Sequence, residues 1–128
     1  MKTKFKIIFS IIMLFTIMLL TSCKMNSAEN GLDLYKENLS SLYEGKDLNY
    51  DSCTYVYVRQ SVKNDNETKE VRTYYYELNI TVDEENIIKY FIYHFQEKTV
   101  EDTTKETYQT YYQKVEDGKL DGRIVKLY

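Results

Sequence analysis

The sequence predicts an α+β domain in which one N-terminal helix packs on a four- to five-stranded antiparallel meander sheet. Apolar residues first recur at intervals of three and four, which is typical of an amphipathic helix. They then alternate with polar residues along several runs, which is typical of half-buried antiparallel strands. Short polar segments at residues 64–66, 83–86 and 117–118 separate these runs, and links of this length join neighbouring strands.

The helix is expected over roughly residues 31–44, before a stop at Gly45. Its apolar face would consist of Leu32, Tyr35, Leu39, Leu42 and Tyr43. Such a helix needs an apolar surface to lie on, and the alternating runs that follow provide one.

Five runs are expected to form the strands, at residues 53–63, 71–82, 87–97, 104–115 and 119–127. The run at 71–82 separates into one face with Tyr74 and Tyr76 and another with Tyr75 and Glu77. The run at 87–97 is apolar on both faces, which predicts a central strand covered on both sides.

The first 23 residues have the layout of a signal peptide, with three lysines followed by the apolar run 7–20. A membrane-spanning helix needs about 20 apolar residues, and this run is shorter. Its end, Leu20-Thr21-Ser22-Cys23, resembles the lipobox of bacterial lipoproteins. The resemblance implies cleavage of residues 1–22, and diacylglycerol and palmitate-type acyl chains on Cys23. Residues 23–30 would then be a tether and 31–128 a single domain. Two acyl chains are enough for stable anchoring.

The order of elements after residue 31 resembles the cystatin-like and NTF2-like folds, in which a helix lies in the curve of an antiparallel sheet. In addition, Gln60-Ser61-Val62-Lys63-Asn64 partly resembles the Gln-x-Val-x-Gly hairpin that cystatins insert into cysteine proteases. This second resemblance implies inhibition of cysteine proteases, a hypothesis that an inhibition assay with papain-type proteases would test. Asn64 replaces the glycine, however, and a chain without Pro and Trp lacks the second cystatin loop.

Tyrosine is the most unusual component of the chain, with 14 residues, all after residue 23. Tyrosine suits strands, and it is also enriched in protein interfaces. One interpretation is that tyrosines build the core of a chain without Trp. The other follows from the single predicted helix, which can cover only one face of the sheet. Tyrosines on the opposite face would then form a contact surface, with Tyr55, Tyr57, Tyr75 and Tyr90 as its candidate residues.

No set of residues typical of catalysis stands out. Cys53 and His94 could in principle act as nucleophile and base, but no signature surrounds either residue and both fall in predicted strands. We expect Cys53 to be buried, and we expect the polar groups of His94 to have hydrogen-bond partners within the sheet. No close spacing of ligands indicates a metal site. The sequence therefore predicts no catalytic residue, no metal and no cofactor.

The charge balance limits the partners. The leader holds three of the 17 basic residues and none of the 20 acidic ones, which leaves the other 105 residues with a net charge of about −6. Nucleic acid is not expected as a partner, because its binding depends on neutralising phosphates.

The leading hypothesis is a non-enzymatic module that binds a protein or peptide of the cell envelope. It would be held at the outer face of the bacterial membrane through acyl chains on Cys23. One alternative is a small-ligand-binding or enzymatic pocket of the NTF2-like type between helix and sheet, containing His94 or Glu77. Another is a structural homodimer.

Overall fold

The computed structural model of the protein describes residues 27–128. The predicted signal peptide and the lipidation of Cys23 concern residues outside this range. Residues 31–128 form one compact unit. No helix within residues 27–128 is long and apolar enough to cross a membrane.

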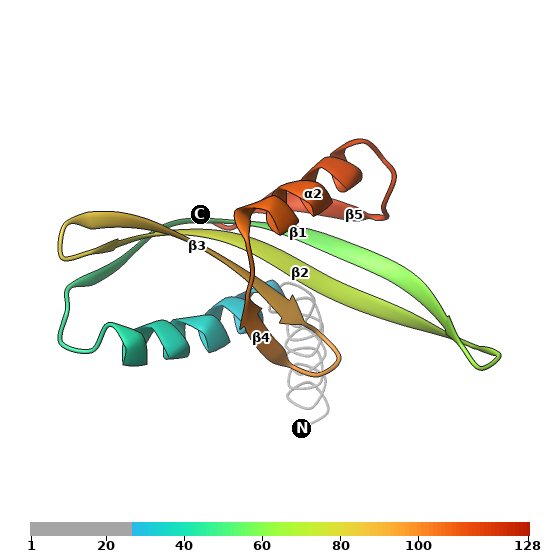
Figure 1. The fold of residues 1–128 in the computed structure, drawn as a ribbon, viewed down its shortest axis with the longest axis horizontal. Coiled ribbons are helices and arrows are strands. Elements are labelled where there is room, and N and C mark those ends of the chain that lie inside the picture. Colours follow the sequence, from blue (N-terminus) through green and yellow to red (C-terminus); the bar gives the residue numbers. More distant parts are fainter. Residues whose placement is uncertain (1–26) are drawn as a thin grey trace, which may run out of the picture. The chain divides into compact units, whose positions relative to one another are not determined.

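The fold is α+β, as predicted: an N-terminal helix is followed by a five-stranded antiparallel sheet (Figure 1). A second helix lies between the fourth and the fifth strand in the chain. The described part of the N-terminal helix covers residues 27–42. The strands are β1 (Leu48–Asn64), β2 (Glu67–Val82), β3 (Glu85–His94), β4 (Thr99–Asp102) and β5 (Gly122–Lys126). The second helix is α2 (Lys105–Glu116).

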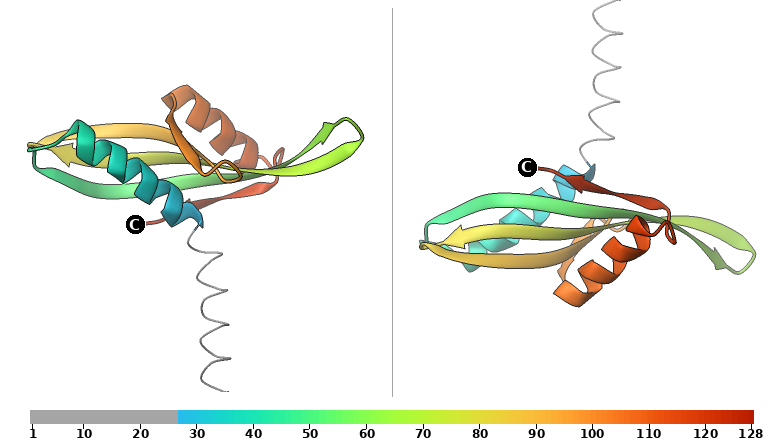
Figure 2. Two further views of the ribbon diagram at one scale, coloured as in Figure 1. Left: turned by 90° about the horizontal axis from the view of Figure 1, so that it is seen from below. Right: turned by 90° about the horizontal axis from the view of Figure 1, so that it is seen from above.

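The sheet is a meander only from β1 to β4. The strand order is β4-β3-β2-β1-β5, so the last strand pairs with the first at the opposite edge. Helix α2 carries the chain across one face of the sheet between these two edges (Figure 2). The prediction of a meander is therefore wrong for β5, which pairs with β1 and not with β4.

The region predicted as a fourth strand, residues 104–115, forms α2 instead. Thr104 caps the helix, since its side chain accepts a hydrogen bond from the Thr107 N–H. Its tyrosines Tyr108, Tyr111 and Tyr112 follow helical spacing and turn toward the sheet. Gly118, expected in a hairpin turn, lies just after the helix with a φ of +74°, a conformation that favours glycine.

The N-terminal helix covers a layer of aromatic side chains on one face of the sheet, which we call the N-helix face. The register pairs Tyr55 with Tyr76, and Tyr76 with Phe91, so these rings share this face. Tyr35 of the helix stacks on Phe91 with ring centroids 3.8 Å apart, and Phe91 stacks on Tyr76 at 4.3 Å. Leu39 is also buried here, whereas Leu42, expected on the apolar face, is 65% exposed.

Helix α2 covers the opposite face, which we call the α2 face. Its core consists of Val56, Val58, Tyr75, Ile92 and Tyr108. Tyr75 stacks on Tyr111 with ring centroids 4.1 Å apart. The prediction that the third strand is covered on both sides is confirmed, because Phe91 and Ile92 are buried on opposite faces. The second cover is a helix that the sequence interpretation missed.

Candidate functional site

The four tyrosines predicted to form one contact surface do not share a face. Tyr55 and Tyr57 lie on the N-helix face, paired with Tyr76 and Tyr74, while Tyr75 and Tyr90 lie on the α2 face. Tyr55 and Tyr75 are also buried, at 8% and 6% exposure. The prediction of one shared, open face is therefore wrong, because α2 covers the face with Tyr75 and Tyr90, and the other two tyrosines lie on the N-helix face.

Cys53 and His94 cannot act together, because their side chains point to opposite faces of the sheet. Cys53 is fully buried, and burial raises the pKa of its thiol to about 12. His94 lies 3.2 Å from a carboxylate oxygen of Glu101 at the β3–β4 edge. Residues 27–128 contain no group of three or more His, Cys, Asp or Glu side chains that could hold a metal ion.

Two hollows bear on the pocket hypothesis. One lies between the N-terminal helix and the sheet edge and measures about 150 Å³, with Tyr35, Leu42 and Asp102 in its lining. Typical ligand pockets measure about 300–1,000 Å³. The other, about 740 Å³, is an open depression along the exposed side of α2. Neither hollow includes His94 or Glu77, and Glu77 instead accepts a hydrogen bond from the Tyr90 hydroxyl.

The most prominent surface feature is a hairpin arm, formed by residues 59–72 at the joined ends of β1 and β2. Strand β3 pairs with β2 only from Thr73 onward, and β5 pairs with β1 only as far as Val58. The arm therefore continues as two strands beyond both neighbours (Figure 2). It closes at Asp65 and Asn66, both with positive φ, a geometry that matches the twist of a hairpin.

The β1 edge of the arm is the more open one. The Cys53 and Arg59 N–H groups donate to the C-terminal segment, at Tyr128 and Asp121. The backbone N–H and C=O groups of successive residues point alternately to the two edges of a strand. Those of Ser61 and Lys63 therefore point to the same edge as Arg59, beyond its contact with Asp121. The β2 edge is partly closed by the side chain of Gln96. It accepts from the Arg72 N–H and donates to the Glu70 carbonyl at 2.9 Å.

The three arginines of the chain lie at or beside the base of the arm, and we call them the arginine cluster: Arg59 and Arg72 in the arm and Arg123 in the adjacent β5. Arg59 is paired directly with Arg72, and Arg123 is paired with Tyr57, two residues before Arg59. All three positions belong to the N-helix face. The arginine side chains also lie near aromatic rings, since Arg72 is 5.6 Å from the Phe95 ring centre and Arg123 is 5.6 Å from that of Tyr57.

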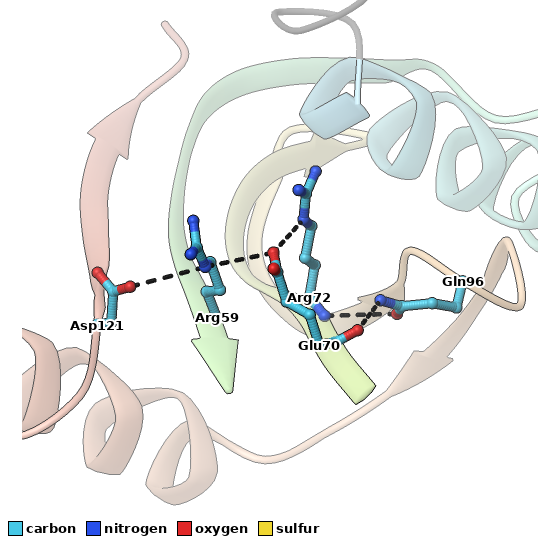
Figure 3. Close-up of polar contacts among 5 residues, drawn as sticks. All are labelled: Arg59, Glu70, Arg72, Gln96 and Asp121. Carbon is cyan, nitrogen blue, oxygen red and sulfur yellow. Dashed lines mark hydrogen bonds and ion pairs between the residues drawn. The ribbon is translucent and has the colours of Figure 1, made fainter. Parts of the chain in front are cut away.

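Glu70 bridges the two paired arginines through their Nε atoms. Its Oε1 lies 3.2 Å from Arg59 Nε and 3.0 Å from Arg72 Nε, and Asp121 lies 3.8 Å from Arg59 Nε (Figure 3). The hydrogen bond to Glu70 raises the pKa of the Arg72 guanidinium. None of the hydrogen bonds or ion pairs described for residues 27–128 uses the Nη atoms of either arginine, and Figure 3 shows both guanidinium groups extending in the same direction.

The sequence interpretation missed this cluster, although a signal for it was present. A two-residue turn at Asp65-Asn66 places Arg59 directly opposite Arg72.

No protein family, curated protein or solved structure matches the chain.

Proposed function

We propose that this protein is a non-enzymatic binding module, anchored by lipid on Cys23 at the outer face of the bacterial membrane, and that the hairpin arm is its contact element for a protein or peptide of the envelope. The anchor is inferred from the leader and the lipobox-like Leu20-Thr21-Ser22-Cys23. The choice of the arm replaces the tyrosine surface, because those side chains lie on two faces of the sheet and two of them are buried.

One observation carries the proposal: the arm extends beyond the neighbouring strands with an open β1 edge and no share in the core. Residues 61–70 are all exposed, and no described buried residue falls within 59–72. Two strands alone are only marginally stable in water, and open strand edges are liable to unwanted pairing. A ribbon that adds little to the core and carries this liability is well explained by a partner that pairs with it.

Crosslinking in intact cells, followed by mass spectrometry, tests the proposal. In the shortened-arm variant, Asn-Gly replaces residues 61–70 and joins Gln60 to Val71, which are already paired across the strands. The matched control is Glu84→Gly in the β2–β3 turn, where Glu84 has a φ of +70°. A partner captured by the native chain and by the control, and lost with the shortened arm, is the expected result.

The Cys23→Ala chain tests the anchor in the same experiment, since capture that depends on the membrane should be lost without the lipid. If the shortened-arm variant captures the same protein as the native chain at the same yield, the arm is not the contact element. Capture of a second copy alone would favour the homodimer.

A further inference from the structure

The arginine cluster concentrates positive charge in an otherwise acidic chain. Lys63 lies on the same face as Arg59, four residues along the strand, so the N-helix face of the β1 edge carries two cations in a row. Glu70 and Asp121 are the acidic side chains in contact with the cluster, and Asp121 is 76% exposed. On the N-helix face, three arginines and one lysine therefore face two carboxylates, so the charge of this face is positive, while residues 59–72 as a whole carry four basic and three acidic side chains.

The free atoms of the cluster suit carboxylates. Arginine presents its Nη and Nε donors as a planar fork that matches a carboxylate with two parallel hydrogen bonds. In both Arg59 and Arg72 the described hydrogen bonds and ion pairs use only Nε, and the side chains are 52% and 43% exposed. Like charges that lie directly opposite on two strands repel. Arg59 and Arg72 are such a pair, and they share the single carboxylate of Glu70. A further carboxylate would relieve this repulsion.

The open backbone edge beside these arginines suits an extended chain. A peptide that adds to the edge would hydrogen-bond with the backbone groups of Ser61 and Lys63, in line with β5. Alternate side chains of an added strand point to opposite faces. Every second residue would therefore lie beside Arg59 and Lys63, and the residues between would lie beside Val62, which is 47% exposed on the α2 face.

We infer that the β1 edge of the arm binds an extended segment of a partner polypeptide with acidic side chains at alternate positions and apolar side chains between them. The arginine cluster holds the carboxylates on the N-helix face, and the backbone of Ser61 and Lys63 holds the strand. This inference rests on the proposed function, because it specifies the chemistry of the partner that the arm contacts.

The binding test uses the full chain as processed by the producing cells, purified in detergent micelles. The probe is a synthetic peptide of about eight residues with alternating Glu and Val, long enough to span the open edge. The same peptide with Lys in place of Glu is the charge control. A peptide with its Glu residues grouped before its Val residues is the order control. We expect the alternating acidic peptide to bind at least about tenfold more tightly than either control, because hydrogen bonds between guanidinium and carboxylate groups are roughly twice as strong as neutral ones.

The matched variants separate the arginines from net charge. Arg59→Gln with Arg72→Gln removes two charges from the cluster, and Lys46→Gln with Lys105→Gln removes two exposed charges outside the arm. The first pair should weaken binding of the acidic peptide by about tenfold or more, while the second should leave it nearly unchanged. Equal loss in both pairs, or binding that does not distinguish the three peptides, overturns the inference.

Two further outcomes also overturn it. One is that the arginine variants lose binding to vesicles of anionic phospholipid and keep binding of the peptide, which would assign the cluster to lipid headgroups. The other is that the shortened arm loses its partner in cells while the arginine variants keep it. That result would leave the arm as contact element and remove only the acidic strand.

Discussion

Replacement of Gly31 by alanine tests the packing between the N-terminal helix and the sheet. Alanine is the best helix former and glycine is poor, so intrinsic propensity alone predicts that Gly31→Ala stabilises the helix by about 1 kcal/mol. The structure predicts the opposite sign. A Cβ atom at position 31 would lie 2.6 Å from the Tyr76 hydroxyl oxygen, 2.6 Å from Tyr93 Cγ and 2.8 Å from Tyr93 Cβ.

These neighbours cannot easily give way, since Tyr76 is fully buried and Tyr93 is 3% exposed. Inserting a methyl group into a well-packed site costs about 1–3 kcal/mol, and several close contacts on two rings place this site toward the upper end. After the gain in helix propensity, we expect a net loss of about 1–2 kcal/mol. For a domain of about 100 residues, each kcal/mol lowers the Tm by about 4–8 °C.

Urea unfolding followed by circular dichroism measures this loss in protein without residues 1–23. Ser40, exposed on the same helix, provides the control. The difference between Ser40→Gly and Ser40→Ala reports helix propensity alone, and we expect it to favour alanine by about 1 kcal/mol. If Gly31→Ala stabilised the protein by as much as this pair differs, the close approach of helix and sheet at Gly31 would be refuted.

Three more changes test other parts of the structure. The pKa of the Cys53 thiol is about 12 in the folded protein, against an ordinary value of 9.0. The stability contributed by the protonated thiol is therefore complete below pH 9 and is lost as the pH rises toward 12. Urea unfolding of the native chain and Cys53→Ala across this window should show a shallower decline in the variant. Gly122→Ala places a methyl group against the Tyr57 carbonyl oxygen, so we expect β5 to detach at a cost of about 3 kcal/mol, measured by urea unfolding and by faster amide exchange in β5. Tyr35→Phe removes a 2.6 Å hydrogen bond to Asp102 and should lower the free energy of unfolding by about 1–2 kcal/mol in urea, and a change within error would show that this bond adds nothing.

Much of the fold could be predicted from the sequence because the first helix and the long strands follow clear periodicities. The alternation in β2 assigns Tyr76, Leu78 and Ile80 to one buried face, and all three are buried together. Helix α2 was missed because its tyrosines favour strands in general, while their spacing of three and four residues is helical. Strand β4, only four residues long, is too short to show a period.

The error in the tyrosine surface has a different cause. Alternation shows which residues of one strand share a face, but it does not relate that face to the next strand. This relation requires the pairing register, which the turn at Asp65-Asn66 sets by placing Tyr55 opposite Tyr76. The same register brings Arg59 and Arg72 together, so the misassigned tyrosines and the missed arginine cluster have one origin.

The positions of the two helices explain why the arm is the most exposed part of the sheet. The N-terminal helix and α2 cover opposite faces over the middle of the strands, where Tyr76, Phe91 and Ile92 are buried. β1 and β2 nevertheless continue through residues 59–72, where the described side chains are exposed or half-buried. Residues 61–70 belong neither to the core nor to the segments that pair with β3 and β5. The exposed length of the arm, its open β1 edge and its arginines are therefore the basis of the proposal that a partner strand pairs with it.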